Sequence, residues 1–229
     1  MAMAALAYAA PAIAQERVET TVSASFVNQY IWRGLDLGNV ALQPTFGIAY
    51  QGVSLTAWGS VGLANASDTK EFDLTLAYAK SGFNVGITDY WFSTGLDPQN
   101  RYFKYGAHAT NHIFEANAGY DFRIVNLQAY VNFTGNDGVN KSGHRAYSTY
   151  LELSAPFKLD FCNALATLGA VPMATSSYGT SGFSVTNISL RATKDIKITN
   201  SFSLPVFAQL TANPCSQKAY LIFGFTLQP

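Results

Sequence analysis

The sequence predicts an all-β protein that forms a closed, antiparallel, up-and-down transmembrane β-barrel of twelve strands. Apolar and polar residues alternate along most of the chain, which is the pattern of half-buried strands. The alternating segments are about 11 residues long, longer than a usual soluble strand and suited to a tilted membrane-spanning strand. Short and long connections follow each other in turn, as in outer-membrane barrels with short periplasmic turns and longer extracellular loops.

The stretch Val40–Leu63 shows the pattern most clearly. Its first half has apolar residues on one face and mainly small or hydroxyl-bearing residues on the other. Gln51-Gly52 predicts a tight turn, after which the alternation resumes. The polar face is small rather than charged, which suits a wall with lipid outside and water inside.

The remaining strands follow from the same alternation. In chain order we expect strands at Thr20–Arg33, Val40–Tyr50, Val53–Leu63, Glu71–Ala79, Phe83–Phe92, Asn111–Phe122, Val125–Thr134, Arg145–Ala155, Leu159–Val171, Phe183–Thr193, Ser201–Ala212 and Lys218–Gln228. Short connections are expected near Gln51, Lys80, Arg123, Pro156 and Lys194, and mostly longer ones from Gly34, Asn65, Ser93, Gly135, Pro172 and Asn213. Because proline cannot donate to a ladder, we expect a bulge or a late strand start at Pro44 and Pro205.

Composition excludes several classes of protein. The 229 residues contain 14 Lys+Arg and 14 Asp+Glu, so the formal net charge is zero and no basic stripe points to nucleic acid. Only 12% of the residues are charged, about half the usual globular share, and 14% are aromatic. A transmembrane barrel fits these values better than a helical membrane protein, and a large soluble β-sandwich stays possible on composition alone. Strand length, loop alternation and the N-terminal segment favour the membrane.

The segment Met1–Ala14 is apolar and ends in Ala12-Ile13-Ala14, the small-x-small pattern of a signal-peptidase site. We interpret residues 1–14 as the remainder of a secretory signal and 15–229 as the barrel domain. The basic n-region of such a signal is missing, which leaves room for a start upstream of Met1. The two cysteines, Cys162 and Cys215, fall near opposite mouths of the predicted barrel, so we expect two free thiols rather than a disulfide.

Several motifs resemble the TorF-type porin family, particularly its Bacteroidetes members. They are Phe26–Gly34 (FVNQYIWRG), Leu42-Gln43-Pro44, Thr56–Ser60 (TAWGS), Asp195-Ile196-Lys197 and Ala219–Gly224 (AYLIFG). The likeness spans most of the mature chain and is specific in the first hairpins. It implies a Gram-negative outer-membrane barrel with passive transport, and it carries over no substrate and no catalytic residue. The order Gln43-Pro44 departs from the family pattern, in which proline precedes glutamine.

The inward-facing positions supply the candidate pore-lining residues. They are Arg33, Trp58, Glu71, Asp73, Glu115, Gln128, Tyr130, Tyr150, Glu152 and Arg191. Acids outnumber bases in this set, and rings of acids in a pore favour cations. The alternative is that these charges pair across a closed lumen.

Arg33 has two possible roles. It either constricts the lumen near its extracellular end and binds an anion, or it pairs with a neighbouring acid such as Asp89. In the second case Tyr30 and Trp32 belong to the interfacial aromatic girdle.

The histidines give no strong sign of catalysis. His108, His112 and His144 fall at extracellular loops, where histidines are usually solvated, and no GxSxG motif occurs. No metal-ligand spacing or cofactor motif is present. We therefore expect that the protein binds no metal or cofactor and that it is not an enzyme.

The function that these patterns favour is a narrow, weakly cation-preferring, monomeric channel for small solutes or ions in outer-membrane lipid. One alternative is an enzyme that acts on lipid at the extracellular rim. That enzyme requires a histidine within reach of a serine or aspartate. The other is a closed structural or partner-binding barrel, whose lumen would be plugged by Trp58, Tyr130, Tyr150 and paired charges.

Overall fold

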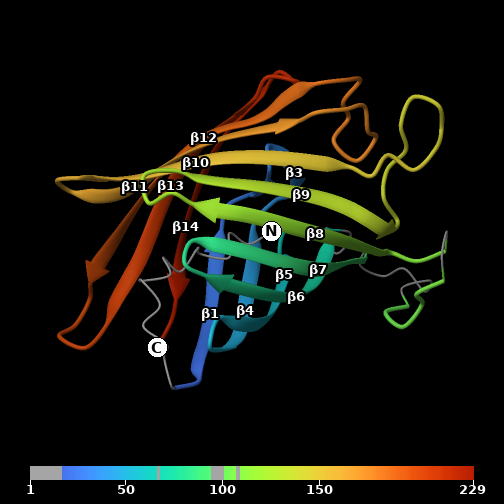
Figure 1. Cartoon of the computed structure of the whole chain (residues 1–229). Coiled ribbons are helices and arrows are strands. Elements are labelled where there is room, and N and C mark those ends of the chain that lie inside the picture. The colour runs from blue at the N-terminus through green and yellow to red at the C-terminus, as the bar shows by residue number, and fades with distance from the viewer. Residues whose placement is uncertain (1–16, 66–67, 94–100, 107–108) are drawn as a thin grey trace.

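The computed structural model describes residues 17–65, 68–93, 101–106 and 109–229. Within these ranges twelve strands form one closed antiparallel barrel, which confirms the predicted fold class (Figure 1). No helix in the described part of the chain is long and apolar enough to cross a membrane. The expected signal segment, residues 1–14, lies outside the described residues.

Each wall strand pairs with its neighbours in sequence, and β1 closes the barrel by pairing with both β4 and β14. The wall strands are β1 (Glu19–Val27), β4 (Ala41–Tyr50), β5 (Val53–Gly62), β6 (Lys70–Lys80), β7 (Phe83–Ser93), β8 (His112–Asp121), β9 (Asn126–Gly135), β10 (Thr149–Leu159), β11 (Cys162–Val171), β12 (Ser184–Lys197), β13 (Ser203–Asn213) and β14 (Lys218–Leu227). This up-and-down order follows from short turns that bring each strand back beside the one before it.

The outer face of the wall is apolar. Ile48, Leu55, Leu76 and Ile87 stand opposite one another on β4 to β7, and each leaves about half of its surface exposed. The neighbouring inward row is small and polar: Gly47, Thr56, Thr75 and Thr88. A soluble barrel would have the opposite arrangement, so this wall fits an outer-membrane β-barrel.

The segment between β1 and β4 leaves the wall. It forms a small hairpin of β2 (Tyr30–Trp32) and β3 (Leu35–Gly38) that pairs only with itself. The predicted first strand, Thr20–Arg33, is therefore wrong beyond Val27, where the wall strand ends.

Local chemistry explains why the first wall strand stops. The Asn28 side chain bonds β14 just beyond the last β1–β14 pair, where its Nδ2 donates to the Leu221 carbonyl and its Oδ1 accepts from the Phe223 amide. Arg33 and Gly34 both have positive φ, 50° and 80°, which favours a two-residue hairpin turn. The chain therefore folds back on itself instead of extending the wall.

The prolines occupy interrupted ladders. Pro44 pairs with Ala24 of β1 and takes no part in the pairing of β4 with β5. The register of β4 against β5 is the same on both sides of Pro44, so the bulge expected there is wrong. Pro205 pairs with β12, and β13–β14 pairing begins only at the next residue. Each proline lacks an amide hydrogen, and the strand on that side, β5 for Pro44 and β14 for Pro205, does not pair at that position.

The turn predicted at Pro156 is also wrong. Pro156 lies inside β10 and pairs with Leu165, whereas pairing of β10 with β9 ends at Ser154. The turn itself falls at residues 160–161, between β10 and β11. Cys162 follows that turn and Cys215 lies in a connection at the other end, and both are free thiols as predicted.

Candidate functional site

The β2–β3 hairpin crosses the lumen. At one end the Tyr30 hydroxyl donates to Glu71 Oε2 of β6 over 2.9 Å. Near the hairpin turn, Asn213 Nδ2 of β13 donates to the Gly34 carbonyl over 3.0 Å. Strands β6 and β13 lie on nearly opposite sides of the strand order, so the hairpin spans the bore.

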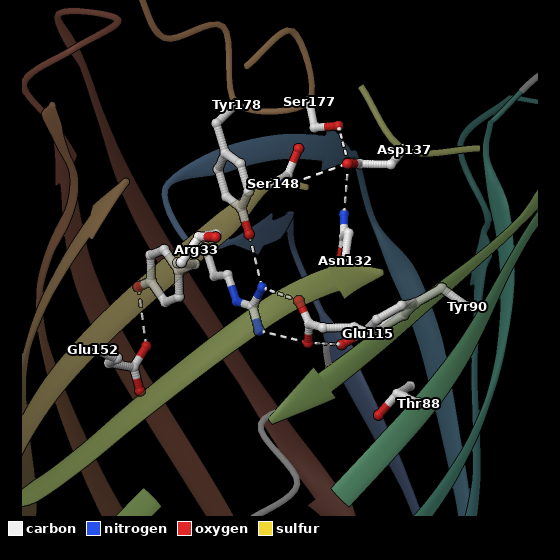
Figure 2. A network of polar contacts seen from close by, with 12 residues as sticks. Arg33, Thr88, Tyr90, Glu115, Asn132, Asp137, Ser148, Glu152, Ser177 and Tyr178 are labelled. Carbon is white, nitrogen blue, oxygen red and sulfur yellow. Dashed lines mark hydrogen bonds and ion pairs between the residues drawn. The ribbon is translucent and has the colours of Figure 1, made fainter. Parts of the chain in front are cut away.

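Arg33, at the tip of the hairpin, makes the central polar contacts of the lumen (Figure 2). Its Nη1 lies 2.6 Å from Glu115 Oε2 and its Nη2 lies 3.0 Å from Glu115 Oε1. Nη1 also donates to the Tyr178 hydroxyl over 2.7 Å. This two-pronged pairing of a guanidinium with a carboxylate is the strongest geometry available to an arginine.

Aromatic rings enclose the Arg33 guanidinium. Its central carbon lies 4.4 Å from the ring centroid of Trp32, 4.0 Å from that of Tyr130 and 4.6 Å from that of Tyr150. A cation over a ring face is attracted by the negative π-cloud. We call Glu115, Tyr130, Tyr150 and Tyr178 the arginine cage.

Burial and pairing act in opposite directions on Arg33. Burial, the largest single effect, would lower its pKa, but Glu115 together with Tyr178 and Tyr90 outweighs burial, and the pKa of Arg33 is raised above its usual value. Burial also raises the pKa of the Tyr178 hydroxyl. Arg33 therefore stays a cation in the folded protein, and Tyr178 stays a neutral acceptor for it.

A second polar cluster lies on β6. Glu71 and Asp73 share its inward face, both are buried, and Asp73 Oδ1 has no hydrogen-bond partner among the described residues. The Trp58 ring lies 5.7 Å from the ring of Tyr30, which bonds Glu71. The base of the hairpin is thus held by this cluster and its tip by the arginine cage.

The ten predicted pore-lining residues all face inward, and most fall into these two groups. Arg33, Glu115, Tyr130, Tyr150 and Glu152 lie around the cage, where the Tyr150 hydroxyl donates to Glu152 over 3.0 Å. Trp58, Glu71 and Asp73 form the β6 cluster, Gln128 is buried on β9, and Arg191 lies over the Phe207 ring at 3.6 Å. Their role in lining a pore stays a prediction.

Two details expected for this region are wrong. Arg33 pairs with an acid, as one of its two expected roles requires, but the acid is Glu115 and not Asp89, because Asp89 faces the outside of the barrel while Glu115 faces the lumen. Tyr30 and Trp32 lie in the lumen and not in an interfacial girdle.

Sequence reasoning missed two tyrosines of the network. The Tyr90 hydroxyl donates to Glu115 Oε1 over 2.8 Å, and Tyr178 accepts from Arg33. Tyr90 could have been found, since it is two residues beyond the inward Thr88 on the same strand. Tyr178 lies in the connection after β11, where no periodic pattern indicates its direction.

An ionisable pair lies on the outside of the barrel. His112 is fully buried on β8, so the expectation of a solvated loop histidine is wrong for this residue. Its Nδ1 lies 2.7 Å from Asp89 Oδ1, and its Nε2 lies 2.6 Å from the Tyr102 carbonyl oxygen. Tyr105 stacks on the imidazole at 4.2 Å between ring centroids.

The other two histidines take no part in this pair. His144 is exposed as expected, and His108 lies outside the described residues. Within the described ranges, no cluster of three or more His, Cys, Asp or Glu side chains could hold a metal ion.

Comparison with known proteins gives a family. The family model described as "Bacterial protein of unknown function (Gcw_chp)" matches residues 11–207. A search of curated proteins finds no match. The family description does not name TorF-type porins, so that resemblance stays an expectation about function. Since the match covers most of the sequence, the chain belongs to the Gcw_chp family of bacterial proteins.

Proposed function

We propose that the protein is a narrow outer-membrane channel for small solutes or ions, which the β2–β3 hairpin holds closed. The observation that carries this proposal is the nature of the plug. The lumen is crossed by a segment of a connection, tethered through Tyr30, Arg33 and Gly34. A tethered segment can leave a lumen, whereas the side chains of a wall cannot.

The outer surface supports the location in outer-membrane lipid, and we propose that the protein is a monomer there. The wall strands are about 10 residues long, the length that a tilted transmembrane strand needs. Their outward side chains are predominantly apolar and exposed, and a patch of this extent on a soluble protein would favour aggregation.

The half of the lumen near the short turns supports a channel rather than a solid barrel. Its walls carry small side chains that are only partly buried, so solvent reaches them from inside. They include Ser25, Thr45, Gly47, Thr56 and Thr75. The occlusion is concentrated at the level of the hairpin, where the large aromatic side chains lie.

The alternatives differ from this proposal in one feature each. A closed structural barrel would hold the same Trp58, Tyr130 and Tyr150 in its lumen, but its hairpin would never leave. A lipid enzyme would use His112, which has Asp89 within reach. We favour a non-catalytic role because His112 Nε2 is bonded to a backbone carbonyl where an enzyme would have a nucleophile.

The test is conductance in planar bilayers, comparing wild type with a barrel in which residues 29–39 are replaced by about two glycine or serine residues. A short replacement suffices because Val27 and Ala41 are already paired. We expect wild type to be closed most of the time and the shortened barrel to conduct steadily, several-fold above wild type. Asp36→Asn is the control, since Asp36 lies on the hairpin with its side chain exposed.

Folding of each variant is checked by circular dichroism and by the shift in gel mobility on heating. A folded, shortened barrel that conducts no better than wild type would contradict the channel and favour the closed structural barrel.

A further inference from the structure

We infer that the arginine cage is a binding site for an organic guanidinium cation with a short apolar tail, which Arg33 occupies as a tethered substitute while the hairpin is folded in. The inference deepens the proposed function and rests on it in one respect, since the hairpin must leave the lumen for a solute to enter the cage.

The cage belongs to the barrel and not to the hairpin. Glu115 lies on β8, Tyr130 on β9 and Tyr150 on β10, while Tyr178 comes from the connection after β11. Glu115 and Tyr150 are almost fully buried. If the hairpin leaves, Trp32 leaves with it, and the Glu115 carboxylate keeps its bond from the Tyr90 hydroxyl but loses its cation. A carboxylate among tyrosine rings without its counter-ion is unfavourable, so the vacated cage favours a cation.

The geometry selects a guanidinium among cations. Each Nη atom of Arg33 donates to one of the two Glu115 carboxylate oxygens, and Nη1 also donates to the Tyr178 hydroxyl. The Tyr130 and Tyr150 rings lie against the guanidinium. An ammonium group is compact and cannot present two parallel donors to one carboxylate or stack as a plane between rings.

A cavity beside the cage supplies room for an apolar tail. It has a volume of about 270 Å³ and is lined by Tyr178 of the cage and by Tyr90, whose hydroxyl donates to Glu115. Its lining is mostly apolar: Phe92 and Ile113 belong to the wall and remain when the hairpin leaves, whereas Trp32, Leu35 and Leu37 belong to the hairpin. With the hairpin folded in, its size is at the lower limit of ligand pockets, which suits a short alkyl tail.

The test uses the full-length Arg33→Ala variant in detergent micelles, with n-butylguanidinium as the probe. We expect saturable binding in titration calorimetry and a change in intrinsic fluorescence. The neutral analogue n-butylurea should not bind, and n-butylammonium should bind several-fold more weakly. Arg191→Ala is the matched control, because Arg191 is a lumen arginine outside the cage, and this variant should gain no affinity.

Adding Glu115→Gln to Arg33→Ala should weaken binding at least tenfold, which corresponds to about 1.4 kcal/mol. If Arg33→Ala does not fold, the shortened barrel without residues 29–39 also lacks Arg33 and takes its place. Wild type should bind the probe more weakly than either variant, since its own hairpin competes for the cage.

The outcomes separate the site from the channel. Saturable, Glu115-dependent binding supports the site even if no variant conducts, and in that case only the channel fails. A folded variant that shows no saturable binding, or that binds n-butylurea equally well, overturns the site whatever the conductance.

Discussion

At Gly34 the backbone and the wall of the barrel leave no room for a side chain. Its φ of 80° lies in the left-handed region, and a Cβ atom there would collide with the Thr186 carbonyl oxygen of β12. The Gly34 carbonyl also accepts from Asn213. One residue therefore sets both the hairpin turn and its contact with the far wall.

We expect Gly34→Ala to weaken the closed position of the hairpin. The left-handed conformation alone costs a non-glycine residue roughly 1–2 kcal/mol, and the collision adds to it. Bilayer recordings should show a several-fold larger open fraction than wild type. Gly182→Ala is the control, because the φ of Gly182 is not in the left-handed region and nothing lies within 4 Å of a Cβ there. If Gly34→Ala is as closed as Gly182→Ala, the hairpin tip does not depend on this contact.

Side-chain direction was more predictable than side-chain partners. Alternation along a strand assigns each residue to one face, and it places the nine predicted inward residues of the wall strands on the lumen side. The partner of Arg33 could not be found this way, because Arg33 lies on a hairpin whose position depends on contacts across the bore. Glu115 is 82 residues away in sequence.

At the scale of elements, the hairpin shows why alternation misled the prediction of the first strand. The Tyr30–Trp32 segment has the same alternation as a wall strand, and local pattern does not reveal which strand will pair with it. Two local signals distinguish this segment from a wall strand. They are Asn28, whose side chain bonds the backbone of β14, and the turn at Arg33-Gly34. Asparagine and Arg-Gly are common enough in strands and loops that neither would have decided the matter alone.

The segment that follows β7 covers a polar pair on the outside of the wall. Asp89 and His112 alternate with apolar residues on the outward faces of β7 and β8, where lipid would make an uncovered charge unfavourable. The Tyr102 carbonyl and the Tyr105 ring lie over the imidazole and shield it. Burial raises the pKa of the Tyr102 hydroxyl to about 12, so this tyrosine stays neutral in its shielding position.

Asp89→Asn should therefore destabilise the barrel. The substitution replaces a carboxylate 2.7 Å from His112 Nδ1 by a neutral amide. The loss of a charged hydrogen bond of this kind costs about 1.5–3 kcal/mol, and the partial exposure of Asp89 places the expected value at the lower end. Urea unfolding in detergent micelles measures it. Asp160→Asn, in the exposed turn between β10 and β11, should be neutral within error. Equal stabilities would mean that the pair contributes nothing to the fold.

At the scale of the whole molecule, the barrel was predictable because every wall strand lies beside its neighbours in sequence. In the part of the chain that the structure describes, the only pairing between distant segments of the wall is that of β1 with β14. Twelve alternating segments and an alternation of connection lengths are enough to specify such a structure. The interior is different, because its charges and rings come from strands far apart and from two connections, and their contacts depend on the closed wall.

The balance of charge in that interior predicts the selectivity of the opened barrel. Removing residues 29–39 removes Arg33, which leaves four acids and one base among the predicted inward residues. The acids are Glu71, Asp73, Glu115 and Glu152, and Arg191 is the inward base. Acidic pore linings favour cations, so in a salt gradient the shortened barrel should show a cation-shifted reversal potential.

Adding Glu71→Gln and Asp73→Asn to the shortened barrel should move the reversal potential toward zero, because both acids lie together on the inward face of β6. Asp160→Asn, in the exposed turn between β10 and β11, removes a carboxylate from a turn and should leave the potential unchanged. An anion-shifted potential in the shortened barrel would mean that Arg191 controls the conducting path. The β6 acids would then hold the base of the hairpin without selecting ions.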